Sequence, residues 1–206
     1  MTDRSVFENI LAGFWKEGVY LVSDAKDAIM SSARIIFAQR GYEGAGVDSI
    51  VRSAGVSKGA FYWHFHSKFD LFKRVMEDEV DRIVSYLADG SAQGEDVIAM
   101  SVRKGEGFLQ LLWKERDSLS LWLELRLLAH RGVEGMRDLT GSLRSRMMGE
   151  MRRVLAEAGG LPDGMEEVLC ILFDGIMFNL WVWFDVEDAV ALWRRSCGVL
   201  FGGEAL

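Results

Sequence analysis

The chain has 206 residues, of which 50% are hydrophobic and 27% are charged, so it can build a core and is not expected to be disordered. A single proline, with few β-branched residues beside Leu, Ala, Met, Glu and Arg, predicts an all-α fold. The net charge of -7 would by itself argue against a partner as acidic as DNA, because DNA binding depends on neutralising phosphates.

The charge is unevenly distributed along the chain. Residues 24 to 74 hold eight Lys/Arg against five Asp/Glu, a net charge of +3, whereas the remainder holds 16 basic and 26 acidic residues, a net charge of -10. This asymmetry predicts a cationic head on an acidic body.

The first predicted element is a short extra helix near the N-terminus. Ser5 and Glu8 have the spacing of a capping box, and apolar residues recur on one helical face until Gly18. A second helical pattern opens at Asp24 and stops at Gly41, a residue that suits the left-handed position after a helix. We assign residues 1–22 to an N-terminal extension.

Two short helices and a longer one follow. The first covers "VDSIVRSAG" and ends at Gly55, the second is capped by Ser57, and the third opens at Ser67, with Asp70 three residues later. Two short helices joined by a turn that contains glycine are the parts of a helix-turn-helix, whose second helix enters the major groove of DNA. We therefore expect residues 23–72 to form a DNA-binding domain.

The stretch "GVSKGAFYWHFHSK", residues 55–68, supplies the groups that such a helix needs. Its start offers free backbone N–H groups and the Lys58 ammonium to a phosphate. Phe61 and Phe65 share one helical face and should point inward, which leaves Tyr62, Trp63 and His64 on other faces. The competing interpretation is an aromatic core helix between solvated lysines, but so many consecutive bulky side chains cannot all face inward on one helix.

Residues 28–72, "AIMSSARIIFAQRGYEGAGVDSIVRSAGVSKGAFYWHFHSKFDLF", closely resemble the DNA-binding domain of TetR-family transcriptional regulators. The matching residues are Phe37, Gly41, Tyr42, Ile50, Ala54, Gly55, Val56, Ser57, Lys58, Gly59, Phe61, Tyr62, His64, Phe65, Lys68 and Leu71. The resemblance implies that the third helix of the domain is the recognition helix and that Lys68 adds a phosphate contact. The predicted DNA-binding residues are Ser57, Lys58, Gly59, Ala60, Tyr62, Trp63, His64 and Lys68.

Two positions depart from the family pattern. Gly46 stands where the family usually has a Ser or Thr cap, which predicts a weaker cap and puts a hydroxyl–phosphate contact there in doubt. Phe69 replaces a usual acidic residue.

Beyond residue 95 the chain becomes rich in Leu, Met and Trp, and we expect helices near 95–115, 117–130, 133–158, 164–184 and 186–201. The segment "LSLWLELRL", 119–127, alternates like a strand, but its helix-forming residues and the lack of a partner strand favour a helix. The long apolar run 168–184 contains Asp174, which is costly at a bilayer centre and favours a helix buried in protein over a membrane span. Residues 73–206 are thus expected to form a helical body with no membrane association.

By resemblance to the family, the body would enclose a pocket for an effector and dimerise through its last two helices. The candidate pocket residues are Phe108, Trp113, Trp122, Glu124, Asp174 and Phe178. Glu124 and Asp174 are acids within apolar runs, so either would meet a cationic ligand or pair with Arg126 or Arg144. His130 is expected to be exposed at a helix end.

An enzyme is the main alternative, but we find no P-loop, no GxSxG and no histidine paired with a cysteine. Cys170 and Cys197 are the only cysteines and lack CxxC spacing, so we expect no metal site, no cofactor and no disulfide framework. No signal-peptide pattern opens the chain, so we expect it in the cytoplasm.

The resemblance to the family, together with these patterns, implies a homodimeric, ligand-responsive transcriptional regulator. The expected partners are double-stranded operator DNA with a palindromic sequence and a small lipophilic effector of unknown identity. We expect the protein to act as a repressor that the effector releases from the operator. The alternatives are a TetR-like activator and a helical ligand-binding module without sequence-specific DNA binding.

Overall fold

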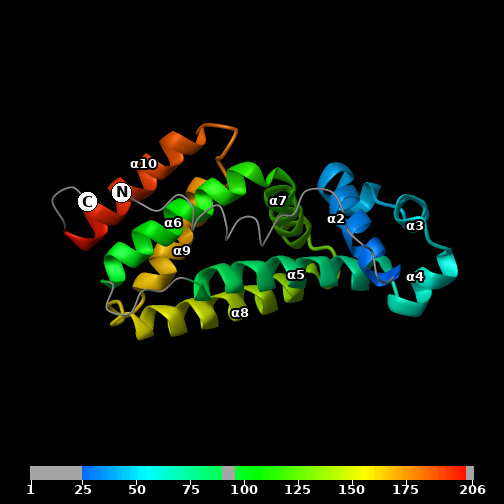
Figure 1. Cartoon of the computed structure of the whole chain (residues 1–206), viewed down its shortest axis with the longest axis horizontal. Coiled ribbons are helices and arrows are strands. Elements are labelled where there is room, and N and C mark those ends of the chain that lie inside the picture. The colour runs from blue at the N-terminus through cyan, green and yellow to red at the C-terminus, as the bar shows by residue number, and fades with distance from the viewer. Residues whose placement is uncertain (1–24, 90–95, 203–206) are drawn as a thin grey trace.

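The computed structural model describes residues 25–89 and 96–202. In these residues the chain forms helices joined by short turns, with one isolated bridge between Leu180 and Phe184 and no strand (Figure 1). The helices are α2 (Ala25–Gly44), α3 (Val47–Ala54), α4 (Lys58–His64), α5 (Lys68–Ala88), α6 (Val97–Lys114), α7 (Arg116–His130), α8 (Met136–Glu157), α9 (Met165–Met177) and α10 (Val186–Phe201). The all-α prediction is confirmed, and the extra helix predicted near residues 5–18 lies outside the described residues.

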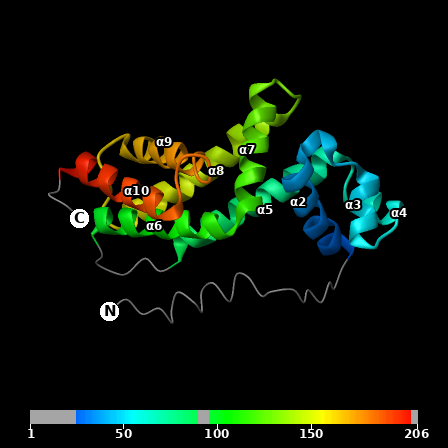
Figure 2. The same cartoon turned by 90° about the horizontal axis from the view of Figure 1, so that it is seen from above.

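The head consists of α2, α3, α4 and the first turns of α5, which lie at one end of the molecule (Figures 1 and 2). Its core is aromatic: Phe37, Phe61 and Phe72 are fully buried, and the rings of Phe37 and Phe72 meet edge to face with centroids 5.1 Å apart. Gly55 adopts φ 68° in the turn between α3 and α4, a conformation that glycine reaches without steric cost. The two short helices therefore have the connection that the sequence predicted.

The continuous helix α5 joins the head to the body. It begins with a cap in which Ser67 accepts a hydrogen bond from the backbone N–H of Asp70 at 3.0 Å, and it extends over 21 residues, about 30 Å. Beyond the head it lies alongside α8 (Figure 1). The boundary that we expected between residues 72 and 73 therefore falls inside one uninterrupted helix.

A polar cluster ties the head to the body at the joint of α2, α5 and α7. Arg34 pairs with Glu79, which is only 3% exposed, and also donates a hydrogen bond to Ser118 Oγ at 2.8 Å. Ser118 Oγ in turn donates to Glu79 at 2.5 Å. Burial raises the pKa of Glu79, while the Arg34 guanidinium acts in the opposite direction. Because a buried carboxylate without partners would be costly, this cluster fixes where α2 meets α5 and α7.

The body forms a second apolar core from α6, α9 and α10. Helix α10 packs closely on α6, where Trp193 lies against Gly105 and donates an indole hydrogen bond to the Val102 carbonyl at 3.1 Å. A Cβ at Gly105 would overlap the indole ring, so the absence of a side chain there permits this approach. Within the described residues, no helix has the length and apolarity that a membrane span requires.

The helix predicted over 164–184 is too long. Helix α9 ends at Met177, and residues 178–184 form a turn in which the Asn179 carbonyl accepts N–H bonds from Val182 and Trp183, at 3.1 and 2.9 Å. Trp181 adopts φ 62°, which a helix cannot contain. The error arose because an apolar run looks the same in a buried helix and in a buried turn, whereas the turn-favouring residue Asn179 is a weak signal.

Candidate DNA-binding surface and body cavity

Helix α4 separates its aromatic residues into an inner and an outer face. Phe61 and Phe65 are buried, with 0% and 2% of their surface exposed, whereas Tyr62 is 53% and Trp63 is 84% exposed. Ser57 caps the helix by accepting the Ala60 N–H at 3.1 Å. The two phenylalanines thus anchor α4 in the head and turn Tyr62 and Trp63 toward the outside, as the helical spacing predicted.

Lys58 lies at the exposed start of α4 and forms an ion pair with Asp48 of α3. Its Nζ lies 2.8 Å from Asp48 Oδ1, and both side chains are more than half exposed. The hydrogen bond between them raises the pKa of Lys58 and lowers the pKa of Asp48, so both groups are charged at neutral pH. The Lys58 ammonium can bind a phosphate only if its ion pair with Asp48 breaks, or if it binds the carboxylate and the phosphate at the same time.

The remaining predicted DNA-binding residues occupy less uniform positions. Ser57 and Gly59 are exposed, Ala60 is half-buried, and His64 is half-buried with its ring against Phe65. Lys68 is directed into the head: its Nζ donates to the Tyr42 carbonyl at 2.8 Å and lies 4.3 Å from the centre of the Tyr42 ring.

The two departures from the family pattern have visible consequences. Gly46 precedes α3 without a side-chain cap, as its lack of a hydroxyl predicted. Phe69 packs against Gly135 in the turn before α8, and a Cβ on that glycine would come within 2.8 Å of the Phe69 ring. An aromatic residue in place of an acidic one therefore adds a contact between head and body.

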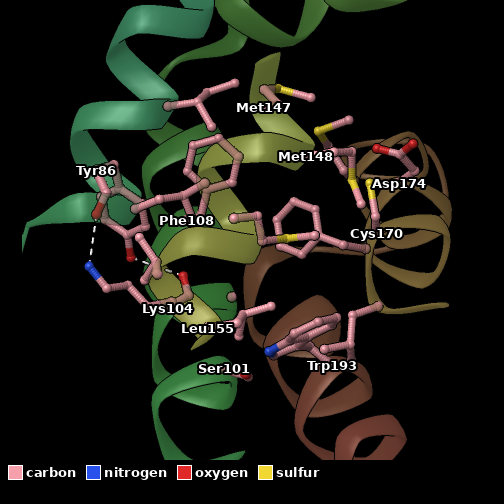
Figure 3. Close-up of a pocket in the computed structure, with 18 of the residues that line it drawn as sticks. Tyr86, Ser101, Lys104, Phe108, Met147, Met148, Leu155, Cys170, Asp174 and Trp193 are labelled. Atoms are coloured by element: carbon pink, nitrogen blue, oxygen red, sulfur yellow. Dashed lines mark hydrogen bonds between the residues drawn. The ribbon is translucent and has the colours of Figure 1, made fainter. Parts of the chain in front are cut away.

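The body contains an apolar cavity of about 170 Å³ between α5, α6, α7, α8, α9 and α10 (Figure 3). Aromatic rings and methionines make up most of its wall, with Phe108, Met147, Met148, Cys170 and Trp193 pointing toward it. Flexible, polarisable methionines suit a cavity that adapts its shape to an apolar ligand.

The polar groups of this wall bind other protein groups. Lys104 donates to the Tyr86 carbonyl at 2.8 Å and to the Asp89 carbonyl, and the Tyr86 hydroxyl donates back to the Lys104 carbonyl at 2.9 Å (Figure 3). Burial raises the pKa of Tyr86 to about 12, so its hydroxyl remains a neutral donor. Ser101 donates to the Val97 carbonyl at 2.7 Å.

The predicted pocket residues divide into two groups. Phe108, Trp122 and Asp174 line the cavity, whereas Trp113, Glu124 and Phe178 do not. Trp113 stacks on Trp181, with ring centroids 4.9 Å apart, and Glu124 points to the head. Helical spacing places a residue on a face, but it cannot show which of several neighbours that face meets.

Asp174 forms an ion pair with Arg126, one of the two arginines suggested by the sequence, and the guanidinium lies 4.3 Å from the centre of the Phe178 ring. The negative charge of the Asp174 carboxylate is therefore balanced by Arg126, a residue of the protein itself. His130 is exposed at the end of α7, as predicted. No sequence pattern pointed to Tyr86 or Lys104, since their place in the wall depends on contacts between distant helices.

The cysteines show no sign of activation. Burial raises the pKa of Cys170, and burial together with Glu106 raises the pKa of Cys197 to about 11. The part of the chain that the structure describes contains no cluster of His, Cys, Asp or Glu suited to a metal ion.

Comparison with known proteins places the head in one family. The family model "Bacterial regulatory proteins, tetR family" matches residues 29–75. The transcriptional activator FasR of Mycolicibacterium smegmatis is 40% identical over 62 residues, which are 30% of this chain and 28% of FasR. The biofilm operon negative regulator IcaR of Staphylococcus aureus (strain Newman) is 29% identical over 89 residues, 43% of this chain and 42% of IcaR. The matched segments thus span well under half of these relatives.

Solved structures match over a greater length but with low identity. A candidate TetR-family regulator from Rhodococcus sp. superposes with a TM-score of 0.71 at 24% identity, over 85% of this chain and 97% of that one. Salmonella enterica GusR gives a TM-score of 0.68 at 16% identity, over 86% and 94% of the two chains. The arrangement of head and helical body is therefore shared with these structures.

Proposed function

The chain belongs to the TetR family of transcriptional regulators, and from this premise we propose that it is a dimeric repressor that leaves a palindromic operator when a small apolar effector enters its body. The observation that carries the proposal is the exposure of Tyr62 and Trp63 on a helix that Phe61 and Phe65 anchor. An indole that is 84% exposed on the second helix of a helix-turn-helix is poorly explained by folding alone and well explained by contact with DNA.

We propose that α4 enters the major groove. Tyr62, Trp63 and His64 would then face base edges or sugar–phosphate, while Ser57, Lys58, Gly59 and Ala60 would approach the backbone at the start of the helix. Lys68 would contribute only if its ammonium, already bound to the Tyr42 carbonyl, directed a further N–H to a phosphate. The cationic head then supplies the attraction that the acidic body lacks.

The dimer would form through α9 and α10. Their outer surface exposes Val168, Ile171 and Val199, at 44%, 66% and 79%, and a shallow depression between the helices adds Leu172 and Leu200. An apolar surface of this kind is typical of an interface between copies of a chain. Pairing would place two α4 helices about one DNA turn, roughly 34 Å, apart and so match a palindrome.

The effector would bind in the apolar cavity. Because Asp174 is paired with Arg126 and the other polar wall groups bind the protein, we propose an uncharged apolar effector rather than a cation. Its entry would favour an arrangement of the dimer in which the heads no longer fit adjacent grooves. Since the chromosome is the proposed target, the protein would act in the cytoplasm.

A TetR-like activator is the second candidate, because the relatives include one named as an activator, FasR, and one named as a negative regulator, IcaR. The direction of regulation follows from where the operator lies relative to a promoter, which the protein does not encode. DNA binding itself is the common requirement of both candidates.

The proposal is tested by selecting binders from randomised duplexes at several salt concentrations. We expect enrichment of a palindrome whose half-sites lie about one turn apart, and an affinity that falls steeply with salt. Sedimentation of the complex should give two chains per duplex. If no duplex is enriched even at 50 mM salt, the protein is not a sequence-specific regulator, and the ligand-binding module without DNA binding becomes the better hypothesis.

A further inference from the structure

Helix α7 lies between helix α6 of the body and helix α2 of the head in both views of the molecule (Figures 1 and 2). Trp122 and Arg126 of this helix line the cavity. Glu124 stands between them, and because each residue advances about 100° around a helix, it projects to the opposite side of α7. One helix thus presents two residues to the cavity and a carboxylate to the head.

The Glu124 carboxylate binds the head at a break in α2. Its Oε1 accepts the Tyr42 N–H at 2.6 Å, next to Gly41, which leaves helical geometry at φ 69° and ψ 172°. A Cβ on Gly41 would lie 2.8 Å from the same oxygen, so the close approach of the carboxylate depends on a glycine there. A short hydrogen bond to an ionised acceptor is among the stronger ones in proteins.

Tyr42 is also held from within the head, through the peptide group on the other side of its Cα. Its carbonyl accepts a hydrogen bond from Lys68 Nζ at 2.8 Å, and Lys68 is the first residue of α5, four residues after α4 ends. Tyr42 is therefore bound through its N–H by α7 and through its carbonyl by the segment that follows the proposed recognition helix. A movement of Glu124 would reach that segment through these two hydrogen bonds.

We infer that Glu124 is a positioning residue that couples the wall of the cavity to the orientation of the DNA-binding head. The inference rests on the proposed function for its biological meaning, since it assumes that the head binds DNA and that the cavity binds an effector. Trp122 and Arg126 would shift with the cavity wall, and α7 would carry Glu124 with them. Glu124 was predicted as a pocket residue; the structure instead gives it a role on the other side of the same helix.

The first test follows hydrogen exchange of the Tyr42 amide. In Glu124→Ala, we expect this amide to exchange roughly tenfold faster or more, since a hydrogen bond to a charged group is lost. Glu124→Gln, which keeps an acceptor oxygen of the same shape, should restore a rate within about threefold of wild type. Glu134→Ala removes an exposed carboxylate from the turn after α7 and serves as the matched control with no effect.

Toluene is the probe for coupling, because engineered apolar cavities of roughly 150 Å³ bind benzene-sized rings. A change in tryptophan emission reports its binding, since the indoles of Trp122 and Trp193 line the cavity. Saturating toluene should speed Tyr42 exchange severalfold in the wild type and leave the already fast rate of Glu124→Ala unchanged. A purely structural hydrogen bond would not respond in this way.

The second test measures affinity for the selected operator. Glu124→Ala should weaken it about tenfold with an unchanged dependence on salt, because no phosphate contact is removed. The inference is overturned if Glu124→Ala leaves Tyr42 exchange unchanged, if toluene fails to bind or leaves wild-type exchange unchanged, or if operator affinity falls equally in Glu134→Ala. If no operator can be selected, the proposed function fails, while the exchange measurements still decide whether Glu124 couples cavity and head.

Discussion

Replacing Lys58 by alanine should change how DNA binding depends on salt more than it changes the fold. The side chain is exposed and its ion pair with Asp48 lies on the surface, where such pairs contribute little to stability. One phosphate contact per head contributes about 0.9 to the slope of log K against log salt, so a dimer on a palindrome should lose about 1.8. Between 50 and 200 mM salt, the affinity of the wild type should therefore fall by a factor about 12 times larger than the affinity of the variant.

Fluorescence anisotropy of the selected operator at 50, 100 and 200 mM salt measures this slope. Lys114→Ala removes an exposed lysine from the end of α6 in the body and is the matched control. Asp48→Asn tests the same contact from the other side: without the competing carboxylate, Lys58 is released to the phosphate, so affinity should rise and the slope should steepen. In the double variant the effect of Asp48→Asn should largely disappear, since its partner is gone. Equal slopes for Lys58→Ala, Lys114→Ala and wild type would refute the assignment of Lys58 to a phosphate.

Three further predictions concern the body. Gly105→Ala should destabilise the fold by about 1–3 kcal/mol in chemical denaturation, because Trp193 must move, and an unchanged midpoint would contradict the packing described. Val199→Asp, at a site that is 79% exposed, should convert the dimer to monomer in sedimentation with little change in monomer stability; persistence of the dimer would place the interface elsewhere. The pKa of Cys197 is raised to about 11, so this thiol should be roughly 0.1% thiolate at pH 8 and reactive only as the pH approaches 11. Rapid labelling of Cys197 by a disulfide reagent in the folded protein at pH 8 would count against its burial.

Local signals were sufficient to predict the head. The caps at Ser57 and Ser67 depend on residues three positions away, and the division of α4 into an inner and an outer face follows from spacing within one helix. Gly41 was predicted to end a helix, and it does adopt the positive φ that such a position needs, although helical turns resume beyond it. Each of these features is decided within about five residues of chain.

The body was predicted less completely because its contacts are long-range. Trp113 and Phe108 are both aromatic residues of α6, yet one stacks on the turn after α9 and the other faces the cavity. No pattern within α6 distinguishes these outcomes. The apolar turn at 178–184 shows the same limit, because hydrophobicity reports burial but not the backbone conformation that is buried.

The strand-like alternation at 119–127 has a structural explanation in the position of α7. Leu121 and Leu125 are fully buried, while Leu123 and Leu127 are 43% and 41% exposed, so the leucines at alternate positions do not have equivalent surroundings. A helix with apolar residues on several faces is one that packs against neighbours on more than one side. Here those neighbours are the head and the helices around the cavity, and Glu124, the one acid of segment 119–127, marks the side that faces the head. The alternation that resembled a strand is therefore explained by a helix that packs against neighbours on more than one side.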